Sequence, residues 1–259
     1  MKRIFIKFSI IFLVLFLFGS CRNTDRSTQN NRQSELATIN GTPAIGSDDY
    51  HYYINVENHT FVMPENVDAS TFFLRINVAT QRVNIWMKDE RGAYTIPVKQ
   101  FIASTGRYET PSPLGTFNLS SRHRWHMFFF SPALGAVTYG QYCVRINGPV
   151  LIHSMVYAEN HNPASILWEQ YNRLGNRASA GCIRVNISAS KWIYDNLPRG
   201  TRVEIYEGED DMPRHLLARP LPQLPPGFTF DPDDIEYIKS DRFKNDPDDI
   251  AFLKSIGRW

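Results

Sequence analysis

Two neighbouring stretches of the chain alternate between apolar and polar residues. In residues 74–78, Leu, Ile and Val alternate with Arg and Asn, and in residues 83–87 Val, Ile and Met alternate with Asn and Trp. A period of two is typical of strands that bury one face. Residues 79–81 leave room for a turn between the stretches, so the pattern predicts a β-hairpin or meander.

Later stretches predict more strands and a few short helices. Apolar runs indicate strands over residues 98–103, 142–146, 150–152 and 201–206. Asn147-Gly148 predicts the turn between two of them. Helices are expected over 165–174, closed by Gly175, and over 189–196, capped by Ser188. This order predicts a mainly β, sandwich-like domain with short inserted helices.

The first twenty residues are predicted to be an export signal rather than part of the fold. Three basic residues precede the apolar run Phe8 to Phe18, and Gly19-Ser20-Cys21 follow it. The run is short for a membrane span and is typical of a signal peptide, here over residues 1–20. Cys21 is then expected to carry a lipid that anchors the exported chain at a membrane. Ordinary cleavage nearby and an uncleaved anchor are the alternatives.

The next segment, residues 21–66, is predicted to be a flexible tether and lead-in. Residues 22–48 are rich in Asn, Ser, Thr, Gln and Arg and contain few apolar residues. Without the basic residues of the signal, 25 basic residues stand against 26 acidic ones. This balance gives no indication of a nucleic-acid partner, which a concentrated basic face would favour.

Residues 208–259 form a Pro-rich acidic tail with a short repeat. Asp231-Pro232-Asp233-Asp234-Ile235 recurs fifteen residues later as Asp246-Pro247-Asp248-Asp249-Ile250. Asp as N-cap followed by Pro at the first helical position predicts a short helix in each repeat. A calcium site is disfavoured because the spacing and the glycine of an EF-hand loop are absent. The tail is expected to dock onto the domain or onto a partner.

Two cysteines remain after Cys21, and one of them is a candidate nucleophile. Cys182 follows Gly181, which allows a sharp backbone turn and could leave N–H groups facing a developing oxyanion. A cysteine nucleophile needs a base, usually His. Arg184 would share the face of Cys182 in an extended segment and could bind a carboxylate. Cys143 is expected to be buried and free, the alternative being a Cys143–Cys182 disulfide.

Several motifs together resemble the catalytic domain of the L,D-transpeptidase (YkuD-type) family. Ser179-Ala180-Gly181-Cys182-Ile183-Arg184 resembles its nucleophile motif, and Ile152-His153-Ser154 its apolar strand ending in His. Residues 104–117 resemble the loop before the catalytic half, and residues 191–203 the closing helix and strand. The resemblance covers residues 67–207. It implies an L,D-transpeptidase-like β-sandwich with short inserted helices.

The resemblance also implies roles for individual residues. Cys182 is expected to be the nucleophile, His153 its base and Ser154 a residue that orients the imidazole, unless a backbone carbonyl does so. Oxyanion donors are expected at Gly181 and Cys182, and substrate contacts at Arg184, Ser179 and Tyr157. His161, closer to Cys182 in sequence, is the alternative base. Ala180 departs from the family, which often has His there.

The implied function is a peptidoglycan L,D-transpeptidase. It would form 3-3 cross-links through a thioester on Cys182, taking the acyl group from a tetrapeptide stem. Transfer to water would make it an L,D-carboxypeptidase, and a non-catalytic wall-binding lipoprotein is the alternative of another class. No cofactor or metal is expected. The predicted partners are stem peptides and, through the anchor, a membrane facing the wall, with the protein acting as an exported monomer in the cell envelope.

Overall fold

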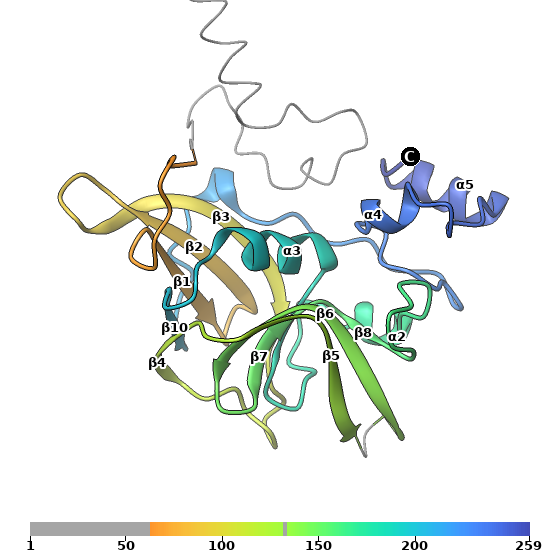
Figure 1. Cartoon of the computed structure of the whole chain (residues 1–259), viewed down its shortest axis with the longest axis horizontal. Coiled ribbons are helices and arrows are strands. Elements are labelled where there is room, and N and C mark those ends of the chain that lie inside the picture. The colour runs from red at the N-terminus through yellow and green to blue at the C-terminus, as the bar shows by residue number, and fades with distance from the viewer. Residues whose placement is uncertain (1–62, 132–133) are drawn as a thin grey trace, which may run out of the picture. The chain divides into compact units, whose positions relative to one another are not determined.

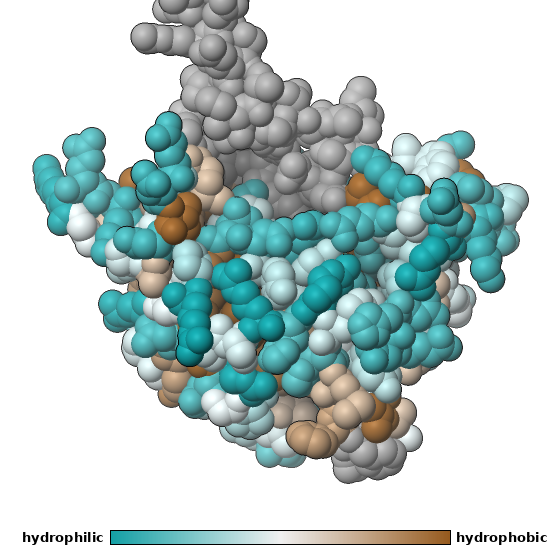
Figure 2. Space-filling model, viewed as in Figure 1, coloured by the Kyte–Doolittle hydropathy of each residue, from teal (hydrophilic) through white to brown (hydrophobic). Residues whose placement is uncertain are grey.

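The computed structural model describes residues 63–131 and 134–259. Cys21, the signal over residues 1–20 and the tether up to residue 62 lie outside the described residues. Figure 2 shows that one face of the described surface is mostly hydrophilic, with scattered apolar patches. In the described ranges, no helix is both long and apolar enough to cross a bilayer.

Ten strands form one hydrogen-bonded sheet in the described part of the chain. They are β1 (Phe72–Asn77), β2 (Arg82–Lys88), β3 (Tyr94–Ser104), β4 (Gly115–Asn118), β5 (Arg122–Ser131), β6 (Ala136–Asn147), β7 (Val150–His153), β8 (Val156–Tyr157), β9 (Ile183–Val185) and β10 (Arg202–Tyr206). The spatial order is β4-β10-β1-β2-β3-β9-β7-β6-β5, and β8 pairs with β6. The predicted mainly β fold is confirmed.

The long strand β3 joins two halves of this sheet (Figure 1). Its first part pairs with β2, whereas Ala103 and Ser104 at its end pair with β9. One buried apolar cluster draws side chains from β1, β2, β3 and β10 in the first half and from β6, β7 and β9 in the second. Helix α3 (Ile187–Asn196) adds Ala189 and Ile193 to this core. Burial of so much apolar surface is the main force holding the halves together.

The local predictions hold best where the hydrophobic period is clean. The expected hairpin is β1 and β2, which pair antiparallel, and β6 and β7 are joined through Asn147 and Gly148. The helix expected over 165–174 is wrong in extent, because only α2 (Trp168–Tyr171) is helical and turns follow it. Helix α3 begins at Ile187, with Asn186 rather than Ser188 at its N-cap position.

The tail packs against the domain through a second apolar cluster. The tail contains a 3-10 helix η2 (Arg214–Leu216), helix α4 (Ile235–Ile238) and helix α5 (Pro247–Ser255). The cluster joins residues that follow the β7 strand to residues from the tail: Met155, Tyr157, Ile166, Tyr171, Leu224, Phe228, Phe230, Ile235, Tyr237, Ile238, Phe243 and Leu253. The tail therefore shares a core with the segment between His153 and Cys182.

Buried polar contacts fix the tail beside the start of α3. Asp231 Oδ2 accepts a hydrogen bond from the Ile187 N–H at 2.8 Å, which satisfies one of the open donors at the helix start. Asp233 Oδ2 accepts from Asn186 Nδ2 at 2.6 Å. Asp233 Oδ1 also forms a buried ion pair with Arg258 Nε at 2.5 Å. These contacts couple the tail to the turn between β9 and α3.

The two repeats of the tail use their aspartates differently. In the second repeat, Asp246 caps α5 by accepting from the Asp248 N–H at 2.9 Å, and Pro247 begins the helix. In the first repeat Asp231 Oδ1 accepts from the Asp233 N–H at 3.0 Å in the same way, but its Oδ2 binds the start of α3, and α4 begins three residues later than Pro232. Its cap is Asp234, which accepts from the Tyr237 N–H at 3.0 Å.

Candidate active site

His153 ends strand β7, and Cys182 directly precedes β9, the parallel strand beside β7. Ile152 of β7 pairs with Ile183 of β9, and both side chains enter the main core. Because side chains alternate along a strand, Cys182, His153 and Arg184 face away from that core. His153 is level with Arg184, two residues after Cys182. An offset of two residues along the strands and one strand spacing across them places the Cα atoms of Cys182 and His153 about 8 Å apart.

The His153 ring is held by a backbone carbonyl. The ring is buried, and its Nδ1 lies 2.6 Å from the Ser154 carbonyl oxygen. A carbonyl only accepts, so Nδ1 carries the hydrogen and Nε2 keeps the lone pair. The Ser154 hydroxyl does not orient the ring, because its Oγ accepts from the Gln141 N–H and donates to the Met155 carbonyl. The Phe128 ring packs against the imidazole, with centroids 4.5 Å apart.

Burial favours the neutral forms of both groups. Burial and, to a smaller extent, the nearby charge of Arg184 lower the pKa of His153 to about 3. Burial also raises the pKa of the Cys182 thiol, although the Leu151 N–H and the charges of Arg184 and Arg145 act in the opposite direction. The resting state thus holds a neutral thiol and a neutral imidazole, an arrangement suited to general-base activation during attack.

The loop that presents Cys182 is braced by side chains. Gly181 has φ of +116°, a conformation that residues with a Cβ rarely adopt. Its N–H donates to Ser179 Oγ at 3.1 Å, and its carbonyl accepts from Ser112 Oγ at 2.8 Å. Ser179 Oγ in turn donates to the Cys182 carbonyl at 2.5 Å.

These contacts correct two expectations from the sequence. The Gly181 N–H points into its own loop, so it does not face an oxyanion in this conformation. Ser179 is 1% exposed and its hydroxyl is used inside the loop, so it shapes the loop rather than facing a substrate. The Cys182 N–H is therefore the remaining candidate for the oxyanion donor.

Arg184 is a buried cation next to the candidate nucleophile. Its Nη1 donates to Gln170 Oε1 at 3.0 Å, whereas its Nε has no hydrogen-bond partner within the described ranges. Burial, with a smaller contribution from the charges of Arg107 and Arg173, lowers the pKa of Arg184 to about 10. The guanidinium stays protonated at neutral pH. A buried charge of this kind is suited to binding a carboxylate.

The structure places Tyr157 and His161 away from Cys182. Tyr157 is fully buried in the second cluster, where the centroids of its ring and the Trp125 ring are 5.4 Å apart. Contrary to the prediction, it does not face the site. His161 is exposed, and its ring packs against that of Trp125 with centroids 5.5 Å apart. The pocket that His161 lines contains neither Cys182 nor His153. His153 is therefore the histidine that the fold brings to Cys182.

Cys143 and Cys182 are both free in the structure. Cys143 lies on β6, opposite His123 of β5, and β7 separates β6 from β9. Two strand spacings amount to about 9.6 Å, whereas a disulfide needs Cα atoms within about 7 Å. The alternative of a disulfide between these cysteines does not fit this sheet. The described residues also contain no cluster of three or more His, Cys, Asp or Glu side chains that could hold a metal.

Comparisons of the sequence with known proteins identify a single family. Residues 71–205 match the family model of the L,D-transpeptidase catalytic domain, YkuD. A stretch of 136 residues is 30% identical to the Bacillus subtilis (strain 168) protein named "Putative L,D-transpeptidase YciB" and covers 51% of this chain. The chain spans 64% of that relative's length.

Solved structures of L,D-transpeptidases give weaker likenesses. One from Mycobacterium smegmatis has a TM-score of 0.42 and 17% identity, covering 52% of this chain and 58% of its own. One from Mycobacterium tuberculosis H37Rv has a TM-score of 0.39 and 21% identity, covering 53% and 58%. These scores are too low to carry an argument, whereas the family model spans just over half of the chain.

Proposed function

Because the chain belongs to the L,D-transpeptidase catalytic domain family, we propose that it is a peptidoglycan L,D-transpeptidase that forms 3-3 cross-links, with Cys182 as nucleophile. The observation that carries the proposal is the pair formed by Cys182 and His153. They share one face of strands β7 and β9, and the Nδ1 contact to Ser154 leaves Nε2 as the proton acceptor.

The first half of the reaction forms a thioester. His153 Nε2 takes the proton from the Cys182 thiol as Sγ attacks the carbonyl carbon of the third residue in a tetrapeptide stem. The Cys182 N–H stabilises the oxyanion of the tetrahedral intermediate. When this intermediate collapses, the C–N bond to the terminal D-Ala breaks, and His153 gives its proton to the leaving amine.

The second half transfers the acyl group. The side-chain amine of a second stem attacks the thioester, His153 accepts a proton from that amine, and the Cys182 thiol is restored. Attack by water in place of the amine releases a shortened stem, which is the L,D-carboxypeptidase outcome. A buried site with a neutral base favours an amine that is also deprotonated.

Arg184 binds a carboxylate of the donor stem. The charges of Arg107 and Arg173 act on this buried guanidinium, and it forms no ion pair with any described residue, so an anionic ligand would offset the repulsion. A carboxylate there also lies next to Cys182, where it holds the stem in the attacking position. Substrate binding and nucleophile placement are then linked through one strand, β9.

The protein acts as a monomer in the cell envelope, held at a membrane by a lipid on Cys21. The sequence around this cysteine resembles a lipoprotein signal. Lipid labelling of cells that express the protein tests this part separately. Wild type is expected to incorporate a radioactive fatty acid and Cys21→Ser is expected not to. Equal labelling of both would disprove the anchor.

Product analysis tests the reaction itself. Purified protein is incubated with disaccharide tetrapeptides, and the products are identified by mass spectrometry. Dimers that have lost one D-Ala are expected from wild type and from Cys143→Ala, whereas Cys182→Ala is expected to give none. Shortened monomers alone would assign the carboxypeptidase, and unchanged substrate would assign the non-catalytic binder.

A further inference from the structure

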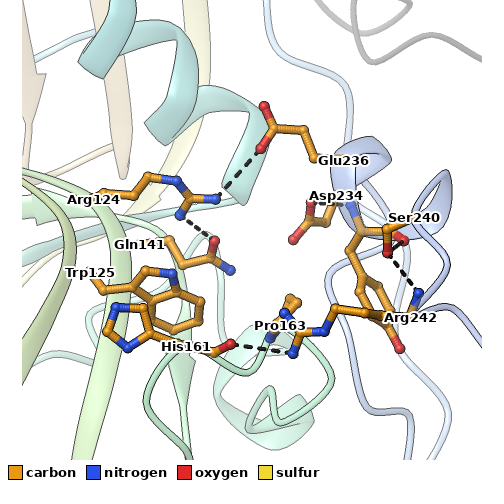
Figure 3. A pocket seen from close by; sticks show the side chains of 10 residues that line it. Arg124, Trp125, Gln141, His161, Pro163, Asp234, Glu236, Ser240 and Arg242 are labelled. Atoms are coloured by element: carbon orange, nitrogen blue, oxygen red, sulfur yellow. Dashed lines mark hydrogen bonds and ion pairs between the residues drawn. The ribbon is translucent and has the colours of Figure 1, made fainter.

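A second site lies where the tail meets the domain. A cavity of about 150 Å³ opens between strands β5 and β6, the loop around His161 and helix α4 with the residues after it (Figure 3). Half of its wall residues come from residues 234–242 of the tail, beyond the 71–205 range of the family match. The family domain alone would thus lack half of this cavity.

The cavity has a buried polar floor and an exposed charged rim. Gln141 is 1% exposed and Asp234 is 5% exposed, and both line the cavity. The rim carries the exposed residues Arg124, Glu236 and Arg242 (Figure 3). The rim of the cavity is therefore accessible to solvent, whereas the side chains of its floor are buried.

The floor contains a buried donor without a hydrogen bond of normal geometry in the described part of the chain. Gln141 Oε1 accepts from Arg124 Nη1 at 2.6 Å, which fixes the orientation of the amide. The opposite atom, Nε2, is buried and makes no hydrogen bond of normal geometry with any described residue. It lies near the Asp234 carboxyl, whose pKa is raised to about 6 by burial and lowered in part by this amide. A buried donor of this kind calls for an acceptor on a ligand.

The charges of the wall balance one another. Arg124 lies 3.5 Å from Glu236, and the wall also contains one further arginine, Arg242, and one further carboxyl group, Asp234. The wall therefore favours neither a cation nor an anion, but it offers many donors and acceptors. Trp125 and Tyr237 add aromatic surface. A neutral ligand with an apolar ring face and several hydroxyl or amide groups fits this composition and volume.

We propose that this cavity binds one sugar ring of an N-acetylated glycan, the strand to which the stem peptides of the substrate are attached. The link to the reaction rests on the proposed function. The sugar amide or hydroxyl oxygen accepts from Gln141 Nε2, its hydroxyls bond to Asp234 and Arg242, and its ring lies against the aromatic wall.

The backbone connects this cavity to the active site. The Gln141 carbonyl accepts from the Ser154 N–H at 3.1 Å, and the Ser154 carbonyl holds His153. The same strand pair thus carries the floor of the cavity and the base. A glycan held in the cavity keeps its attached stem bound to the domain, which raises the local concentration of the donor.

Calorimetric titration with chitotetraose, a β-1,4-linked oligomer of N-acetylglucosamine without peptide, tests the site. The protein carries Cys182→Ala, so no chemistry intervenes. Binding is expected with a Kd of about 1 mM or tighter. Arg242→Gln is expected to weaken it at least about fivefold, which is about 1 kcal/mol. Arg219→Gln, an exposed arginine of the same tail outside the cavity, is the matched control and is expected to bind as the parent does.

Two results would overturn the proposal. One is the absence of binding at about 10 mM chitotetraose, well above the expected Kd, both as heat in the calorimeter and as chemical-shift changes in NMR spectra. The other is equal binding by the Arg242→Gln and Arg219→Gln proteins. A fold change is excluded as the cause when both variants show the same far-ultraviolet circular dichroism and melting temperature.

Turnover measurements separate this inference from the proposed function. With active protein, Arg242→Gln is expected to raise KM at least about fivefold for a disaccharide tetrapeptide and to leave kcat/KM for the free tetrapeptide unchanged. Turnover of both substrates with no effect of Arg242→Gln would reject the glycan site and keep the enzyme. Chitotetraose binding without turnover would reject the enzyme and keep the site.

Discussion

The Nδ1 atom of His153 lies 2.6 Å from the carbonyl oxygen of Ser154, and this contact determines which ring nitrogen is free to act. The carbonyl belongs to the next residue in the chain, so the tautomer is set by the backbone rather than by a separate acidic side chain. The base is therefore neutral and oriented without a charged third residue.

Replacement of this histidine tests its role. His153→Gln is expected to slow acyl-enzyme formation about 10²–10⁴-fold, because the proton acceptor is lost. The measurement is the appearance of a covalent adduct on Cys182 by intact mass spectrometry, with a carbapenem as the acylating reagent. His161→Gln is the matched control and is expected to react at the wild-type rate. Equal rates for His153→Gln and wild type would remove His153 from the mechanism.

The thiol of Cys182 is expected to become more reactive as the pH rises past neutrality. Its pKa is raised by burial, so the thiolate fraction is small at pH 7 and keeps increasing above pH 9. Iodoacetamide labelling from pH 6 to about 10 is measured in a Cys21→Ser background. Cys143 is fully buried and is expected to stay unlabelled. A plateau already reached by pH 7 would instead indicate a preformed thiolate–imidazolium pair.

Arg184 is expected to act through substrate binding. Arg184→Gln should raise KM for a tetrapeptide donor about 10- to 100-fold, the range for loss of a charge-assisted hydrogen bond. Arg184→Lys is expected to rescue only in part, because lysine lacks the planar fork. A donor amidated at its C-terminus separates binding from folding. Wild type is expected to have a higher KM for the amidated donor than for the free acid. If Arg184→Gln shows the same ratio of KM values, Arg184 does not bind the C-terminal carboxylate.

The contact between Asp231 and the Ile187 N–H predicts that the tail stabilises α3. Asp231→Ala should lower the free energy of unfolding by about 2 kcal/mol, since it removes a cap and leaves a buried donor unpaired. Urea unfolding followed by circular dichroism measures this. Asp241→Ala, at an exposed tail position, is the control and should change stability by less than about 0.5 kcal/mol. Equal effects of both substitutions would show that the cap contributes nothing.

The features that were predictable from the sequence are those that short segments determine. Cys182 and the strand ending at His153 belong to local motifs, and the clean alternation of residues 74–78 and 83–87 places β1 and β2. Strand β5 was harder to predict because neighbouring phenylalanines hide its alternation. Phe128 packs against His153, whereas Phe129 is 93% exposed, and the two residues are chemically the same.

The errors in the site arise from distant contacts and from local competition. Tyr157 lies between base and nucleophile in sequence, which suggested a place in the site. Its burial depends on tail residues such as Phe230 that are more than 70 positions away. Ser179 could serve a substrate or its own loop, and a hydroxyl near free backbone groups favours the nearer partner.

The parallel pairing of β7 with β9 brings Cys182 and His153 close together although they are far apart in sequence. The distance between the two residues is set by the register of the two strands rather than by the 29 positions that separate them in sequence. The intervening stretch is therefore the part of the chain in which insertions have least effect on the chemistry. In this protein that stretch has become the surface on which a tail from outside the family domain is built.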